Sequence, residues 1–114
     1  MTKHNKGWGY ELWVANSALY CGKILHINAG KKMSWHYHKV KDETFYCISG
    51  HVVLFYGSSD SIGLSEIVNL NPGDSFHIPP LMKHCLYSPW EDSEIAEFST
   101  QHFENDSYRI IKGD

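Results

Sequence analysis

The sequence predicts an all-β protein, a single domain built as a sandwich or barrel. The chain has 114 residues, a length that suits one domain with one core. Hydrophobic residues make up 42% of it and charged residues 20%, which is an ordinary globular balance. Short runs rich in β-branched and aromatic residues alternate with turn residues, and no stretch shows sustained helical periodicity. These observations favour short strands joined by tight turns.

Clusters of glycine, asparagine and proline separate the expected strands, because Gly and Asn tolerate positive φ and Pro presets its own φ. Pro79 and Pro80 cannot donate ladder hydrogen bonds, so we expect a strand to end before them. We divide the chain into an N-terminal arm (1–18), a barrel (19–100) and a C-terminal segment (101–114). The expected strands are Leu19–Ile27, Met33–His38, Glu43–Ser49, His51–Tyr56, Ser65–Leu70, Ser75–Ile78, His84–Ser88, Glu94–Phe98 and Tyr108–Ile110.

The N-terminal arm is rich in aromatic residues, with Trp8, Tyr10 and Trp13 followed by Tyr20. One interpretation is that the arm packs across the barrel or against a second subunit. The other is that it forms a stacking wall for a sugar ring. An aromatic pair adds about 1 kcal/mol beyond the area it buries, so both uses are energetically reasonable.

Charge and cysteine content narrow the functional class. The net charge is −3 and Arg109 is the single arginine, which does not suit a nucleic-acid-binding surface. The N-terminus has no apolar signal region, and no apolar run is long enough to cross a bilayer. Cys21, Cys47 and Cys85 are odd in number and widely spaced, which is typical of a reducing compartment. We therefore expect a cytoplasmic protein that binds neither nucleic acid nor membrane.

Four polar side chains predict a metal site. His36 and His38 are two residues apart on an expected strand, so both project to one side. We expect Glu43 to open the antiparallel partner strand of a hairpin and to face them, and His84 to return from a later strand. Three imidazoles and a carboxylate are a suitable ligand set for one divalent transition metal with positions left open for substrate. Zn, Mn and Fe fit this set, and so do Co and Ni.

The two segments that carry these residues resemble the cupin signatures. Residues 30–50 match the first signature, Gly-x5-His-x-His-x3–4-Glu-x6-Gly, without a gap. Gly73, Pro79 and His84 match the second, Gly-x5-Pro-x-Gly-x2-His-x3-Asn, in which Leu81 replaces the second glycine and Ser88 the asparagine. The resemblance implies a jelly-roll β-barrel with the metal ligands His36, His38, Glu43 and His84 at its mouth.

A narrower resemblance covers most of the chain. The Trp8–Glu11, Ile95–Gln101 and Glu104–Arg109 segments are similar to parts of the isomerase domain of type II phosphomannose isomerases. Lys39 stands where that family has an arginine, and a lysine offers a point charge instead of a two-pronged fork for phosphate. The resemblance implies metal-dependent carbohydrate chemistry and a homodimer. We expect the N-terminal arm to cross to the neighbouring subunit.

The leading hypothesis is a cupin that isomerises or epimerises a sugar or sugar phosphate. The metal would act as a Lewis acid on adjacent sugar oxygens, and a side-chain base would move the proton between carbons. The alternatives are an Fe or Mn cupin dioxygenase and a barrel that only binds a small ligand. Lys31, Lys32, Lys39 and Lys41 are expected on solvated faces. The alternative is that Lys39 and Lys41, which adjoin the ligands, draw an anionic sugar or phosphate toward the barrel mouth. Candidates for the base are His77, Tyr46 and Lys83, together with Glu97 and His102.

Overall fold

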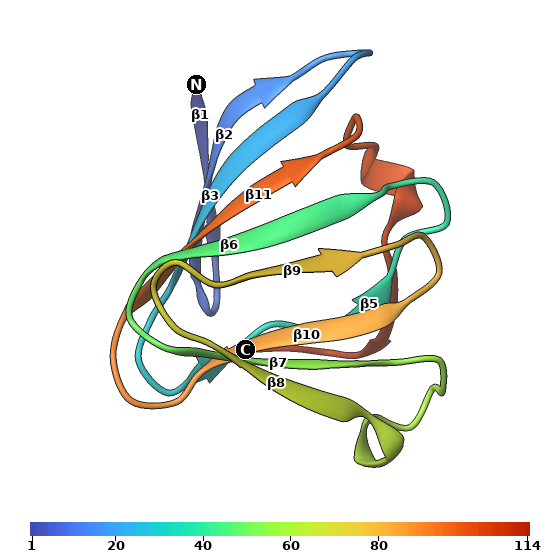
Figure 1. Ribbon diagram of the computed structural model, residues 1–114. Helices are drawn as coiled ribbons and strands as arrows, with labels where there is room; N and C mark the ends of the chain where they lie inside the picture. The colour runs from blue at the N-terminus through green and yellow to red at the C-terminus, as the bar shows by residue number, and fades with distance from the viewer.

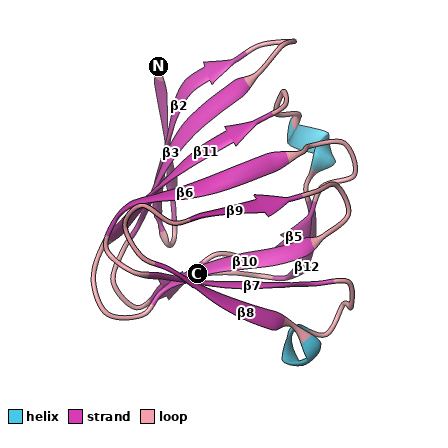
Figure 2. Ribbon diagram, in the orientation of Figure 1, coloured by secondary structure: helices cyan, strands magenta, loops and turns pink.

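Two antiparallel sheets face each other in the computed structural model, which describes residues 1–114 (Figures 1 and 2). No α-helix is present and no helix could cross a membrane; two short 3-10 turns, η1 (Ile62–Leu64) and η2 (Glu104–Asp106), lie in connections. The first sheet runs in the order β1 (Thr2–Lys6), β2 (Gly9–Asn16), β3 (Cys21–Ile27), β11 (Ser93–Ser99), β6 (Glu43–Ser49) and β9 (Ser75–Ile78). The second runs β12 (Tyr108–Ile111), β5 (Trp35–Tyr37), β10 (Lys83–Ser88), β7 (Val52–Gly57) and β8 (Glu66–Leu70), with β4 (Lys31–Lys32) also paired to β10. The predicted all-β class is confirmed.

The core lies between the two sheets and follows strand alternation. Side chains on β3 alternate between buried and partly exposed positions along the whole strand. Leu25, Phe45, Leu54 and Ile95 are each no more than 2% exposed and belong to one hydrophobic cluster. Burial of such a side chain contributes roughly 1.5–3 kcal/mol to folding. One continuous core therefore holds both sheets together as a single barrel.

The predicted strands agree closely with the observed ones. β6 and β9 have the predicted bounds, and β9 ends directly before Pro79 and Pro80. The expected strand Met33–His38 is instead shortened to β5, and a break at Met33 and Ser34 separates β5 from the short β4. The backbone next to this break pairs with the C-terminal residues, since the Asp114 N–H donates to the Lys32 carbonyl at 2.9 Å.

The N-terminal arm is a β-hairpin, which was not predicted. β1 pairs with β2, and β2 continues the first sheet beside β3 of the same chain. Gly9 has φ +151°, and a Cβ there would lie 1.9 Å from the His26 carbonyl oxygen, so the turn needs glycine. Trp8 is only 7% exposed and joins the core. The arm is thus one wall of its own barrel.

The prediction that His36, His38 and Glu43 share one hairpin is wrong. β5 pairs with β10 and β12, whereas β6 pairs with β11 and β9. Residues 39–42 therefore cross from one sheet to the other (Figure 1). The Asp106 carboxylate stabilises this crossing by accepting hydrogen bonds from the backbone N–H groups of Lys39, Val40 and Lys41. Glu43 consequently faces the histidines from the opposite sheet.

Candidate metal centre

The three histidines of the signatures converge at one end of the barrel. His36 on β5 lies directly opposite His84 on β10, and His38 follows β5. One ligand atom from each of these three side chains lies within 4.8 Å of the others, so the cluster could hold a metal ion. His84 is 1% exposed and His38 is 6% exposed. The sequence-predicted histidines are thus brought together in a nearly dry environment.

Backbone carbonyls fix the orientation of all three imidazole rings. The Nδ1 atoms lie 2.8 Å from the Ser34 carbonyl for His36, 2.7 Å from the Asp106 carbonyl for His38 and 2.9 Å from the Met82 carbonyl for His84. A carbonyl can only accept, so each Nδ1 carries the proton and each Nε2 keeps its lone pair. Ligands of protein-bound metals are commonly oriented in this way.

Glu43 completes the candidate ligand set from β6. Its side chain is 2% exposed, and Oε2 lies 3.3 Å from His38 Nε2 and 3.2 Å from His84 Nε2. Neither Glu43 Oε2 nor His84 Nε2 makes a hydrogen bond of acceptable geometry. An unsatisfied buried polar atom costs roughly 1–3 kcal/mol, a cost that a shared cation would remove. The donor set of three nitrogens and one carboxylate therefore fits a divalent transition metal.

The pKa values of these groups follow from burial and mutual charge. Burial and then the neighbouring His84 and His38 hold the pKa of His36 well below its usual value. Burial also lowers the pKa of His38, although the Glu43 carboxylate opposes this effect. Burial is also the largest effect on His84 and acts in the same direction, but Glu43, the Met82 carbonyl and Glu97 together outweigh it and raise the pKa. His36 and His38 are thus in the neutral form that a metal requires.

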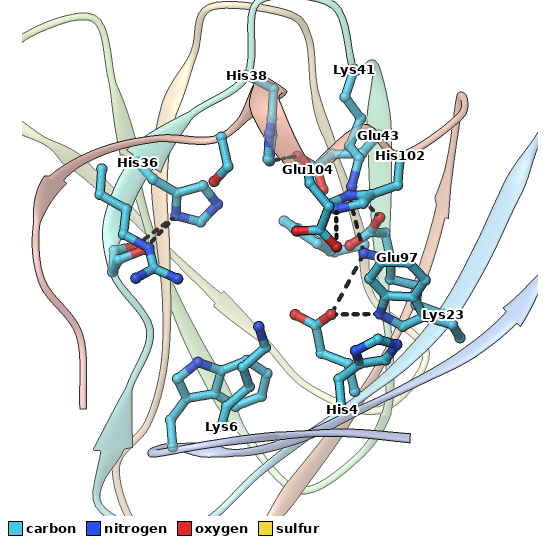
Figure 3. Close-up of a pocket in the computed structure, with 17 residues that line it drawn as sticks. His4, Lys6, Lys23, His36, His38, Lys41, Glu43, Glu97, His102 and Glu104 are labelled. Atoms are coloured by element: carbon cyan, nitrogen blue, oxygen red, sulfur yellow. Dashed lines mark hydrogen bonds and ion pairs between the residues drawn. The ribbon is translucent and has the colours of Figure 1, made fainter. Parts of the chain in front are cut away.

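A cavity of about 250 Å³ opens beside the histidines. Figure 3 shows His36 and His38 on one side of it and Lys23, Glu97 and His102 on the other. Strand β1 borders the cavity with His4 and Lys6. Among the lining residues only Trp8, Trp13 and Phe45 are apolar. The cavity is therefore suited to a small, strongly polar molecule.

Two ion pairs form the wall opposite the histidines. Lys41 Nζ lies 2.9 Å from Glu97 Oε2, and both side chains are almost fully buried. Burial raises the pKa of Glu97, but Lys41 and Lys23 outweigh it and lower the value below the usual range. Lys23 Nζ also lies 3.5 Å from Glu11 Oε1. Lys41 is thus a buried structural cation, contrary to the expected solvent-facing role, and Lys39 lies over the Tyr108 ring.

The first three residues considered as the base do not line this cavity. His77 pairs in register with Thr44, one position from the inward Ile78, and its side chain is 59% exposed beside Asp42. Tyr46 lies between buried neighbours on β6 and points outward. Lys83 donates to the Ser58 carbonyl at 3.2 Å, outside the cavity. Strand alternation therefore directs these side chains elsewhere.

Several residues of the cavity wall were missed by sequence reasoning. Glu97 and His102 were considered as the base and do line it, and Trp13 was considered as part of a stacking wall for a sugar; Lys23 and Glu11 were not assigned to it. A signal for Lys23 was present, because it occupies an inward position of β3 together with Cys21, Leu25 and Ile27. A lysine at such a position is buried only when a partner or a cavity receives it.

Comparisons with known proteins agree with this architecture. Residues 23–96 match the cupin domain family. The chain is 33% identical over 55 residues to quercetin 2,3-dioxygenase of Bacillus subtilis (strain 168), a match that covers 48% of this chain and 14% of that protein. The chain thus spans about a seventh of that relative's length.

Solved structures share the fold at low sequence identity. The capsular polysaccharide assembling protein CapF of Staphylococcus aureus superposes with a TM-score of 0.79 at 16% identity, covering 95% of this chain and 33% of CapF. KdgF of Halomonas sp. superposes at 0.77 with 17% identity, covering 92% and 90%. Oxalate decarboxylase of Lactobacillus farciminis superposes at 0.80 with 18% identity, covering 95% and 33%. With the family match over residues 23–96, these observations establish that the chain belongs to the cupin family.

Proposed function

We propose that the protein is a metal-dependent isomerase or epimerase of a small, carbohydrate-like substrate. The observation that carries this proposal is the set of three converging imidazoles whose Nδ1 atoms face backbone carbonyls, with Glu43 Oε2 beside them. His36, His38, Glu43 and His84 would hold one divalent metal. A bound Zn, Mn or Fe ion would act as a Lewis acid on a substrate carbonyl or hydroxyl, an effect worth several kcal/mol.

The charges around the cavity favour an anionic sugar. Lys6 and Arg109 line it, and neither has a carboxylate within 4.0 Å in the protein. A guanidinium fork binds carboxylate or phosphate through two hydrogen bonds. A sugar acid or sugar phosphate would satisfy both cations while its hydroxyl groups meet the polar wall. The fold shared with a capsular polysaccharide assembling protein is compatible with such a substrate.

Glu11 is the best-placed proton acceptor. Its Oε1 accepts from Trp13 Nε1 at 2.8 Å and lies near Lys23, whereas Oε2 has no partner in the protein. The side chain lines the cavity and is 17% exposed. Glu11 would take the proton from the carbon next to the substrate carbonyl and return it to the neighbouring carbon. Glu97 is less suitable because, against the effect of burial, Lys41 and Lys23 lower the pKa of its carboxylate, which makes it a weaker base.

The second candidate is a cupin dioxygenase, favoured by the partial match to quercetin 2,3-dioxygenase. Three histidines and a glutamate can also hold a redox metal. An isomerase needs no dioxygen and works with redox-inert zinc. Consumption of dioxygen by the iron-loaded protein, without isomerisation by the zinc-loaded protein, would favour this candidate.

Elemental analysis of the purified protein tests the site first. We expect about one Zn, Mn or Fe per chain, with His36→Ala and His84→Ala losing most of it. His26→Ala is the matched control, because His26 stacks on Tyr10 outside the cavity and should keep full occupancy. Full occupancy in both ligand variants contradicts the assigned shell.

An isomerisation assay over a panel of aldose phosphates and uronates tests the reaction. We expect turnover that a chelator removes and added metal restores. Glu11→Gln should lower kcat by at least a hundredfold at unchanged metal content. Turnover by Glu11→Gln at the wild-type rate would exclude Glu11 as the base, and no turnover of any sugar would count against the isomerase.

A further inference from the structure

Lys23 and His102 form an unusual pair in the cavity wall. Lys23 Nζ lies 3.2 Å from His102 Nδ1, and the Lys23 side chain is 2% exposed. Two hydrogen bonds between Asn16 and the backbone of His102 fix the histidine, at 2.8 Å and 3.2 Å. The Trp13 ring contacts the imidazole edge-on, with centroids 4.9 Å apart. The imidazole is therefore immobilised against the N-terminal hairpin.

The contact with Lys23 determines where the His102 ring carries its proton. A lysine ammonium has three donors and no acceptor. The 3.2 Å contact is therefore a hydrogen bond only when His102 Nδ1 is unprotonated. A neutral ring then bears its proton on Nε2. The nearest carboxylate oxygen to Nε2 is Glu104 Oε1 at 3.9 Å, beyond hydrogen-bond distance, and Glu104 is 83% exposed.

The charged groups around His102 keep the ring neutral. Burial comes first, then Lys41 and Lys23, and together they lower the pKa of His102 to about 3. Glu97 acts in the opposite direction, and His38 adds to the lowering. Glu11 on β2 faces Lys23, and Glu104 lies beyond the ring edge. Cations thus dominate the surroundings that act on the imidazole.

We propose that His102 is a substrate-contacting residue, a neutral hydrogen-bond donor that stabilises a substrate oxyanion through Nε2–H, with Lys23 as its positioning residue. This inference rests on the proposed function and adds the group that would stabilise the negative charge developing on a substrate oxygen. His102 lines the cavity on the side opposite His36 (Figure 3), so a sugar bound between them would be contacted on both sides.

The chemistry explains why a neutral ring suits this position. When a base removes the proton next to a carbonyl, the electron pair moves onto the carbonyl oxygen, which becomes negative. A fixed donor aimed at that oxygen stabilises the transition state more than the substrate. The Lys23 ammonium behind the ring polarises it, so that the Nε2–H becomes a stronger donor without losing its proton. Removal of one such donor lowers kcat by roughly a hundredfold to a thousandfold.

Nitrogen NMR of histidine-labelled, zinc-loaded protein tests the proton position without any substrate. We expect His102 to stay neutral, with its proton on Nε2, from pH 8 down to pH 4. In Lys23→Met, which keeps the aliphatic stem, we expect the ring to titrate at a higher pH. A proton on Nδ1, or a His102 that titrates near pH 6.5 in the wild-type protein, overturns the inference.

Titration with an aldonohydroxamate tests the contact, because its planar pair of oxygens resembles an enediolate. We expect binding to shift the His102 Nε2–H resonance, with at least tenfold weaker affinity in His102→Ala and most of the affinity kept in His102→Gln, which retains a donor. Equal affinity of His102→Ala and wild type at full zinc occupancy overturns the proposed contact, and so does failure of the zinc-loaded protein to bind the probe. The proposed function fails separately, through missing metal or missing turnover, so the two failures are distinguishable.

Discussion

Leu81 adopts a backbone conformation that ordinarily favours glycine. Its φ is +75°, and it is the only non-glycine residue of the chain with positive φ. The position is the one at which the second cupin signature has a glycine. The turn is kept because the Leu81 N–H donates to the His38 carbonyl at 2.7 Å, next to the histidine cluster. The leucine side chain is 57% exposed, so its burial does not offset the strain.

Leu81→Gly should therefore stabilise the protein. A non-glycine residue in the left-handed region costs roughly 1–2 kcal/mol, and the larger entropy of an unfolded glycine cancels part of the gain. We expect the free energy of unfolding to rise by about 0.5–1 kcal/mol in urea titrations. Leu81→Ala is the control, because alanine keeps the strain and should give no increase. A loss of stability in Leu81→Gly would show that the leucine side chain contributes to the turn.

At the scale of elements, η2 is joined to the crossing segment 39–42 by one residue. The Asp106 carboxylate accepts three backbone N–H groups from that segment, at 2.9–3.1 Å, and its carbonyl accepts Nδ1–H of His38. These backbone hydrogen bonds outweigh burial and lower the pKa of Asp106. Asp106 thus sets both the path of the chain toward Glu43 and the orientation of one histidine.

Replacement of Asp106 by alanine should weaken metal binding although the carboxylate is not a ligand. Loss of a residue that orients metal ligands typically costs 10–100-fold in affinity. We expect a loss of at least tenfold in zinc affinity, measured by competition with a chelating dye, and a lower free energy of unfolding. Glu104→Ala, in the same 3-10 turn but 83% exposed, should change neither quantity. Wild-type zinc affinity in Asp106→Ala would show that η2 does not orient the metal ligands.

The local alternation of apolar and polar residues predicted most strands. The errors concern which strands pair, because pairing depends on residues far apart in the sequence. The bounds of β6 and β9 follow from alternation and flanking turn residues. The hairpin β1–β2 was missed because β1 is polar throughout and the inward positions of β2 carry Glu11 and Trp13, which face the cavity. The predicted pairing of the Glu43 strand with the histidine strand was wrong because a short polar connection suits a hairpin and a sheet crossing equally well. His36 and His38 were found because their spacing is that of one strand, and His84 through the second signature. His102 was considered only as a base, because its contact with Lys23 joins residues far apart in the sequence.

At the scale of the whole molecule, buried ionisable groups couple stability to pH. The pKa of His102 is lowered from the usual 6.5 to about 3, so the unfolded chain binds a proton there that the folded chain does not. Stability from this group is therefore lost as the pH falls below 6.5. Glu97, whose pKa is also lowered, contributes above its usual value of 4.5 and loses its contribution as the pH falls further.

Acidification should therefore destabilise the metal-free protein. We expect the free energy of unfolding to decrease between pH 6.5 and pH 5, with His102 accounting for about 1–2 kcal/mol of the decrease. Urea titrations at several pH values measure the slope. His102→Gln should show a shallower decrease because it has no proton to bind. Equal slopes for the two proteins would mean that the imidazole is not held neutral in the fold.

The outer face of the first sheet carries exposed apolar side chains. Phe98 on β11 is 60% exposed, and Tyr46 and Ile48 on β6 are 40% and 41% exposed. Apolar side chains gathered on a sheet face are typical of an interface. We expect a homodimer by light scattering, with Phe98→Glu shifting the mass to monomer. Leu64→Glu, on the distant η1 turn, should leave the mass unchanged, and a monomeric wild-type protein would contradict this prediction.

Because residues 39–42 cross between the sheets, the candidate ligands come from both sheets. His36 and His84 are anchored in one sheet and Glu43 in the other. An ion held by all of them would act as a cross-link between the two halves of the barrel, in the manner of a disulfide. Its binding energy would then resist separation of the sheets, so slow unfolding and tight ion retention would be selected together. A substitution that loosens the barrel far from the cavity would also shorten the residence time of the ion.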